Sequence, residues 1–88
     1  MRFLLAMTLI VSAAPALAGP QCTNEPVSAW LPQAEFQKKI VAAEGYQIQV
    51  FKVTDGNCYE LYGRDKTGKR IEIYFHPVTG AIVKTSSR

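Results

Sequence analysis

The chain has 88 residues, 48% of them hydrophobic, and its ten Lys and Arg outnumber seven Asp and Glu to give a net charge of +3. This length suits one small domain rather than several. The basic residues are dispersed and are not interleaved with aromatic side chains on one segment, which argues against nucleic acid as a partner.

The N-terminus has the three parts of a secretory signal peptide. Arg2 supplies a positive charge, residues 3–11 form an apolar run, and Ala16 and Ala18 place small side chains at the −3 and −1 positions of a cleavage site. The apolar run is too short to span a bilayer. We therefore predict cleavage after Ala18, no membrane span in the mature chain, and a periplasmic or secreted protein that begins at Gly19.

The sequence divides into three parts. Residues 1–18 are the predicted signal peptide, residues 19–29 are a polar, proline-containing lead-in segment, and residues 30–88 are a single domain. A domain of this size has little apolar surface to bury, so a covalent crosslink would stabilise it substantially.

Both cysteines, Cys22 and Cys58, follow the predicted cleavage site. In an oxidising compartment such a pair predicts a disulfide. Closing the loop between them would stabilise the fold by roughly 3–4 kcal/mol in the loop-entropy model. Free thiols that serve as metal ligands or as a nucleophile are the alternative, but no CxxC spacing or second ligand cluster supports it.

One helix is predicted from Pro32 to Glu44. Proline suits the first turn of a helix, and Phe36, Ile40 and Ala43 recur at the spacing of an apolar stripe. Gly45 fits the left-handed residue that follows a helix end.

After the helix the hydrophobic period changes to two, which is typical of strands. The four predicted strands are Tyr46–Thr54, Cys58–Gly63, Arg70–His76 and Ala81–Thr85. Short connections rich in turn-forming residues separate them, so neighbouring strands should be antiparallel. The predicted fold class is α+β, with one N-terminal helix packed on a four-stranded antiparallel meander.

Alternation within the strands sets which side chains share a face. The expected cross-strand pairs are Leu61 with Ile73, Glu60 with Tyr74, Tyr62 with Glu72, and Phe75 with Ile82. The first strand has apolar residues in both phases, which predicts a bulge or a two-sided edge strand near Val50. The predicted core comprises Phe36, Ile40, Ile48, Leu61, Ile71, Ile73, Phe75 and Ile82.

One helix cannot cover both faces of the sheet. The second face carries Glu60, Tyr62, Glu72 and Tyr74, with Val83 beside them, and it is either solvated or the place where a partner docks. Tyrosine offers a large amphipathic contact area, as binding surfaces require. The alternative is that tyrosine simply suits strands.

Few residues point to catalysis. His76, the only histidine, precedes Pro77 and is most simply a turn residue. General-base catalysis would need a nucleophile, and Cys58 is expected to be oxidised. Glu60 and Glu72 could form an acid–base pair, but cross-strand pairing on an open sheet explains them better. We predict no catalytic residue.

Two loops, at residues 55–57 and 65–68, superficially resemble cation-binding loops. Each offers too few oxygen ligands for calcium. No metal and no other cofactor is predicted.

Several motifs together resemble a small secreted PepSY-domain protein. They are DGNCYE at 55–60, Tyr62-Gly63, FHPVTG at 75–80 with Ile82-Val83, and the helix segment from Trp30-Leu31 to Gly45-Tyr46. The resemblance implies a periplasmic or extracellular α+β domain without catalysis of its own. Related domains occur in the propeptides of thermolysin-like peptidases, which implies a role in restraining or regulating a peptidase.

The sequence departs from the family pattern at His76, where Asp or Asn commonly precedes the proline. Asp or Asn caps such a turn with its side chain. Histidine is expected to do so less readily, and it would make the turn a candidate switch that responds to pH.

The leading hypothesis is a non-catalytic periplasmic binding module that inhibits or modulates a peptidase or another envelope protein. The alternative is a small-ligand or metal-binding protein that uses His76 and neighbouring acids. A hydrolase is a more remote third hypothesis.

Overall fold

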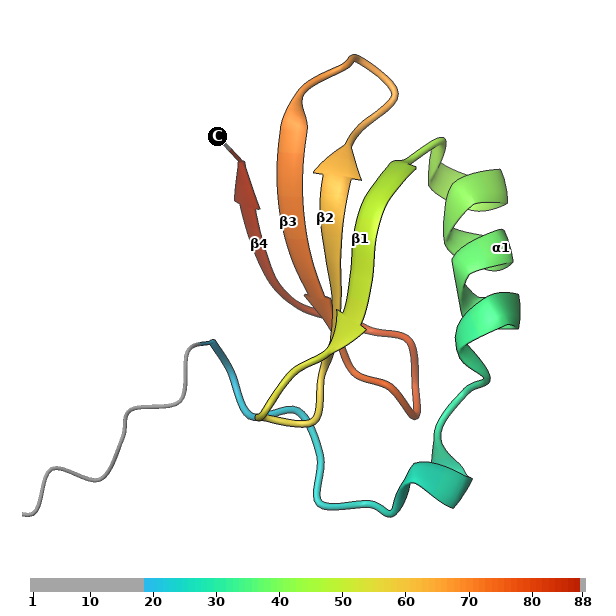
Figure 1. Cartoon of the computed structure of the whole chain (residues 1–88), viewed down its shortest axis with the longest axis vertical. Helices are drawn as coiled ribbons and strands as arrows, with labels where there is room; N and C mark the ends of the chain where they lie inside the picture. The colour runs from blue at the N-terminus through green and yellow to red at the C-terminus, as the bar shows by residue number, and fades with distance from the viewer. Residues whose placement is uncertain (1–18, 88) are drawn as a thin grey trace, which may run out of the picture.

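Residues 19–87 are the part of the chain that the computed structural model describes, and the predicted signal peptide lies outside it. The elements, in chain order, are the 3-10 helix η1 (Val27–Ala29), α1 (Gln33–Glu44), β1 (Gln47–Val53), β2 (Tyr59–Arg64), β3 (Arg70–Phe75) and β4 (Ile82–Ser87). The strands form one antiparallel sheet in the order β1-β2-β3-β4, with α1 on one of its faces (Figure 1). The predicted α+β fold is confirmed.

Helix α1 begins and ends close to the predicted residues. Pro32 is its N-terminal cap residue, and Gly45 follows the helix at a φ of 69° and donates its N–H to the carbonyl of Val41. This left-handed conformation carries little cost for glycine.

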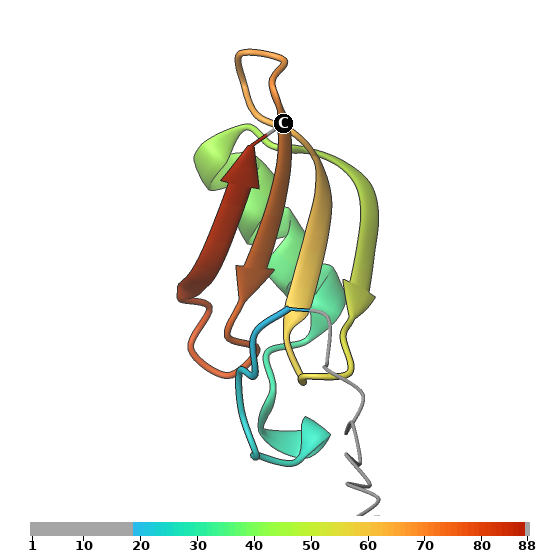
Figure 2. The same ribbon diagram turned by 90° about the vertical axis from the view of Figure 1, so that its left-hand side faces the viewer.

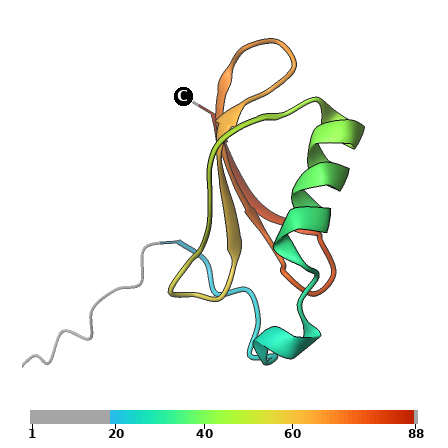
Figure 3. The ribbon, with the colours of Figure 1, turned by 45° about the vertical axis from the view of Figure 1, so that its right-hand side comes forward.

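The apolar stripe of α1 is shorter than predicted. Phe36 and Ile40 are buried, but Ala43 is exposed. The expectation that Ala43 continues the stripe is wrong because α1 diverges from the sheet toward its C-terminal end (Figure 3). The helix therefore contacts the sheet mainly through Phe36 and Ile40.

The register between β2 and β3 is the predicted one. Leu61 pairs with Ile73, Glu60 with Tyr74, and Tyr62 with Glu72. The register of β1 against β2 shifts between Ile48 and Val50, as the mixed phase of the first strand predicted.

Strand β4 departs from the prediction in one respect. Ile82 pairs with Phe75 as expected, but its side chain is 54% exposed and does not belong to the core. The β3–β4 register shifts between Tyr74 and Phe75, and β4 is an edge strand on which Ile82 borders a cleft of about 240 Å³ together with Phe36 and Ile40 of α1. A single helix lying across the sheet is too narrow to bury both edges.

The core lies between α1 and the sheet, and it is richer in aromatic rings than predicted. Its buried members are Trp30, Phe36, Ile40, Tyr59, Leu61, Ile71, Ile73 and Phe75, and Ile48 is partly buried beside them. The ring of Phe36 packs edge-on against Phe75 with centroids 5.1 Å apart. Tyr59, whose hydroxyl donates to the carbonyl of Leu31, packs against Trp30 at 5.6 Å. These contacts anchor the chain just ahead of α1.

Candidate partner-binding face

The face of the sheet opposite α1 carries the side chains that were predicted to bind a partner. The four residues Glu60, Tyr62, Glu72 and Tyr74, which we call the acid–tyrosine face, come from the two central strands β2 and β3. The antiparallel register brings them together, because Glu60 lies opposite Tyr74 and Tyr62 opposite Glu72. Figure 2 shows this side of the sheet, with α1 behind it.

This face is less open than the sequence suggested. Glu60 is only 2% exposed and Tyr74 only 7%, whereas Tyr62 and Glu72 are half-buried. Part of the cover comes from the lead-in segment, which runs across the lower end of the sheet (Figure 2). Gly19 lies so close to the Tyr74 ring that a Cβ on it would stand 2.8 Å from Cε1.

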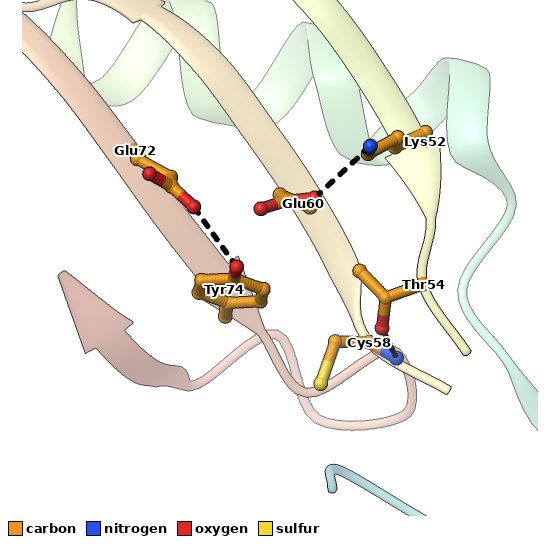
Figure 4. Close-up of polar contacts among 6 residues, drawn as sticks. All are labelled: Lys52, Thr54, Cys58, Glu60, Glu72 and Tyr74. Atoms are coloured by element: carbon orange, nitrogen blue, oxygen red, sulfur yellow. Dashed lines mark hydrogen bonds and ion pairs between the residues drawn. The ribbon is translucent and has the colours of Figure 1, made fainter. Parts of the chain in front are cut away.

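Polar contacts connect the acid–tyrosine face to β1. The Tyr74 hydroxyl donates to Oε1 of Glu72 at 2.9 Å, and the ammonium of Lys52 lies 3.6 Å from Oε1 of Glu60 (Figure 4). Lys52 also stands 5.5 Å from the centroid of the Tyr62 ring. The remaining oxygen of Glu60, Oε2, is buried and accepts no hydrogen bond from the described residues.

The tyrosines of this face are held in their protonated form. Burial, followed by the carboxylates of Glu60 and Glu72, raises the pKa of Tyr62 to about 12. The polar contact between the Tyr74 hydroxyl and Glu60, followed by burial and the contact with Glu72, raises the pKa of Tyr74 as well. A phenolate beside two carboxylates would add a third negative charge, so both hydroxyls remain donors near neutral pH.

A cleft of about 190 Å³ opens between β1 and the acid–tyrosine face. Its lining residues are Lys52, Val53, Thr54, Asp55, Glu60, Tyr62 and Tyr74. Neither this cleft nor the membership of Lys52 in the site was predicted from the sequence. The alternation of side chains along the first strand could have indicated Lys52. If Phe51 faces the core, the next residue, Lys52, must face the opposite side of the sheet, where Glu60 lies.

The predicted disulfide joins Cys22 to Cys58, with Cα atoms 5.1 Å apart. It fixes the lead-in segment to the start of β2. The N–H of Cys22 donates to the carbonyl of Gly56 at 2.9 Å, and the Asn57 amide donates to the carbonyl of Thr23 at 3.2 Å. No free cysteine exists in the described region, so no thiol there can act as a nucleophile or metal ligand.

His76 lies away from the acid–tyrosine face, in the turn between β3 and β4. Its Nδ1 accepts hydrogen bonds from the N–H groups of Val78 and Thr79 at 3.2 and 3.3 Å. His76 thus caps the turn with its side chain, and its lower readiness to do so than Asp or Asn stays a prediction. Within residues 19–87 no three His, Cys, Asp or Glu side chains cluster as metal ligands would.

The loop at residues 65–68 is a turn whose carboxylate is engaged internally. Oδ1 of Asp65 accepts hydrogen bonds from the hydroxyl and N–H of Thr67 and from the N–H of Lys69. These bonds, that of the Thr67 hydroxyl foremost, lower the pKa of Asp65. The carboxylate serves the turn rather than a cation.

The fold and the site together define a small α+β module in which one helix covers one face of a meander and polar residues occupy the other. The chain matches, over residues 2–86, the family described as the peptidase propeptide and YPEB domain, and it belongs to this PepSY family. The resemblance predicted from its motifs is confirmed. Searches of curated proteins and of solved structures gave no match.

PepSY domains are propeptide-like modules that are generally non-catalytic. The disulfide and the family both fit a protein that works outside the cytoplasm. Among residues 19–87, no helix has the length and apolar character needed to cross a membrane.

Proposed function

We propose that the protein is an exported, non-catalytic binding module whose acid–tyrosine face docks on another envelope protein, with a peptidase as the partner class. The observation that carries the proposal is this face itself, where half-buried Tyr62 and Glu72 present hydroxyl, ring and carboxylate next to a cleft. Membership of a propeptide family supports a peptidase as the partner. The signal-peptide pattern, with cleavage after Ala18, supports action in the periplasm or outside the cell.

The chemistry of the face favours a partner with basic and apolar groups. Two carboxylates lie beside two tyrosine rings, and the rings supply contact area with little conformational entropy to lose. A partner's Lys or Arg could pair with the carboxylate of Glu72, and the position of the Lys52 ammonium 5.5 Å from the Tyr62 centroid indicates that this ring is suited to a cation.

The test is inhibition and capture of peptidases from the native envelope. The exported protein is compared with Tyr62→Ala and Glu72→Gln variants, which change half-buried groups, and with Gln37→Ala on α1 as the control. We expect each face variant to reduce inhibition of the envelope peptidase activity and capture of the enzyme at least tenfold. The Gln37 control should match the wild type.

Face variants that inhibit and capture as well as the wild type would overturn the role of this surface. Export is tested separately by the mass of the protein recovered from the envelope. We expect a chain that begins at Gly19 and carries the Cys22–Cys58 crosslink.

A further inference from the structure

A buried carboxylate in the acid–tyrosine face lacks half of its expected partners. Glu60 is 2% exposed, and only its Oε1 faces a cation, Lys52, which is itself 54% exposed. Oε2 is buried and accepts no hydrogen bond from the described residues. Burying a charged oxygen without a donor is costly, so buried carboxylates normally find a second hydrogen-bonding or cationic partner.

None of the neighbouring groups donates a hydrogen bond to Oε2, although the hydroxyls of Tyr62 and Tyr74 both lie close enough to Glu60 for its carboxylate to raise their pKa. The single hydrogen of the Tyr74 hydroxyl is donated to Glu72. Lys84 lies opposite Tyr74 on β4 but is exposed, and Asp55 in the β1–β2 turn is itself an acid. Lys52 approaches from the β1 side of Glu60, whereas Oε2 points toward β3 (Figure 4). Oε2 of Glu60 therefore lacks a hydrogen-bond donor on the side of Tyr74, and a positively charged donor would satisfy it best.

Gly19 occupies that side. A Cβ on Gly19 would lie 3.0 Å from the Tyr74 hydroxyl oxygen and 2.8 Å from ring atom Cε1, so its backbone rests on the hydroxyl end of the ring. The next residues are fixed firmly. The carbonyl oxygen of Pro20 lies 3.2 Å from Sγ of Cys58 and would be 2.2 Å from a Cβ on Gly56, and the disulfide follows at Cys22.

We propose that the acid–tyrosine face is a binding site for a primary ammonium group and that its occupant is the chain's own α-ammonium at Gly19, bound to Glu60 beside the Tyr74 hydroxyl. The proposal rests on the cleavage after Ala18 put forward under the proposed function. Hydrolysis of that peptide bond consumes one water, leaves a carboxylate on Ala18 and leaves a protonated amine on Gly19. One neutral N–H donor thereby becomes a cation with three donors at the place where Glu60 lacks one.

The consequence is a domain that is more stable after processing than before. The residue at position 19 must also be small, because Gly19 has a φ of 92° and no room for a Cβ. An alanine there would push the ammonium away from Glu60 or displace the Tyr74 ring.

Chemical synthesis gives a direct test, since the processed chain can be assembled at Cys22. All helices and strands of the described structure, together with the core, lie within residues 19–87, so the processed chain contains the folding unit. A Gly-Pro-Gln thioester, with a free or an acetylated ¹⁵N-labelled amine, is ligated to residues 22–88, and the disulfide is then formed. NMR titration of the labelled amine measures its pKa, and chemical denaturation measures the unfolding equilibrium.

We expect the pKa of the Gly19 amine to lie at least one unit above its ordinary value of about 7.7–8.0. Acetylation should raise the unfolding equilibrium constant about tenfold at neutral pH, because a pKa shift of one unit corresponds to a tenfold change in that constant. Because the folded pKa is raised, this difference is fully present below about pH 7.7 and disappears as the pH rises through the raised value.

Variants identify the carboxylate. Glu60→Gln should return the amine pKa to its ordinary value and abolish the effect of acetylation. Glu35→Gln, at an exposed position of α1, should preserve the raised pKa and the effect of acetylation. An ordinary pKa in the wild type, or a raised pKa that persists in Glu60→Gln, overturns the proposal. Equal stability of the acetylated and free forms would also overturn it. These chains begin at Gly19 by synthesis, so the result is independent of processing in the cell and of partner capture.

Discussion

Gly63 on β2 is the residue on which the irregular pairing of β1 depends. A Cβ at Gly63 would lie 1.9 Å from the carbonyl oxygen of Gln47 and 3.4 Å from the Cα of Ile48. Both neighbours are backbone, and they lie where the β1 register shifts. The first strand can therefore approach β2 closely only because this position has no side chain.

Gly63→Ala should force β1 away from β2 and lower the free energy of unfolding by about 3 kcal/mol, the upper end for overpacking. The matched control is Gly68→Ala, where the φ of 85° strains alanine but nothing lies within 4 Å of the new Cβ. Its cost should be about 1 kcal/mol. Denaturant titration of both variants measures the difference, and equal losses would contradict the steric explanation.

The tyrosine side chains predict how stability changes at high pH. The pKa values of Tyr46, Tyr59 and Tyr74 are raised, and that of Tyr62 is raised to about 12. Unfolding returns these pKa values to about 10, so the tyrosines of the unfolded chain lose their protons at a lower pH than those of the folded protein. The stability that the protonated phenols provide is complete below pH 10 and is lost as the pH rises through the folded values.

Ultraviolet titration of the phenolate should therefore show less ionisation at pH 10 in the native protein than in the unfolded chain. Glu60→Gln should lower the pKa of Tyr62 and Tyr74, because one neighbouring negative charge is removed. Glu35→Gln is the control and should leave the titration unchanged. Native tyrosines that ionise like those of the unfolded chain would contradict this expectation.

At the scale of elements, α1 is attached to the sheet by few side chains. Ile40→Ala should lower the free energy of unfolding by about 2–5 kcal/mol because Ile40 is buried in the core. Ala43→Gln should change it by less than about 0.5 kcal/mol, since Ala43 is exposed. Thermal and denaturant unfolding of the two variants checks the observed divergence of α1, and a large loss from Ala43→Gln would contradict it.

Local patterns predicted the elements and their pairing well. The end of α1 at Gly45 and the pairing of Leu61 with Ile73 depend on neighbouring residues and on strict alternation, which the sequence displays directly. Ala43 and Ile82 were misplaced for another reason. Their burial depends on the direction of α1 across the sheet, and that direction is set by tertiary packing, here of Phe36 against Phe75.

The candidate site was only half predictable for a similar reason. Register placed Glu60 next to Tyr74, but the burial of both arises partly from the lead-in segment, which has no periodic pattern of its own. The two cysteines indicated that this segment is attached near Cys58. They did not indicate that Gly19 would continue onto the Tyr74 ring.

For the whole molecule, the crosslink accounts for a large share of stability. Replacing both Cys22 and Cys58 with alanine should lower the free energy of unfolding by about 3–4 kcal/mol, since the unfolded chain is no longer constrained. The free energy of unfolding of this variant is compared with that of the wild type before and after reduction by a thiol reagent. Oxidised and reduced wild type of equal stability would contradict the prediction.

The same crosslink turns the chain from Cys22 to Cys58 into a covalent ring that contains α1 and β1 and leaves β3 and β4 outside. One cut by a peptidase inside the ring opens it without releasing a fragment. The product keeps its two ends joined and gains only the mass of one water. A cut after Cys58 can separate the C-terminal strands, and residues 66–70 and 81–85 are exposed places for it. For a domain proposed to meet peptidases, a cut between Cys22 and Cys58 thus releases no fragment, and the vulnerable bonds after Cys58 lie in the β2–β3 turn and along β4.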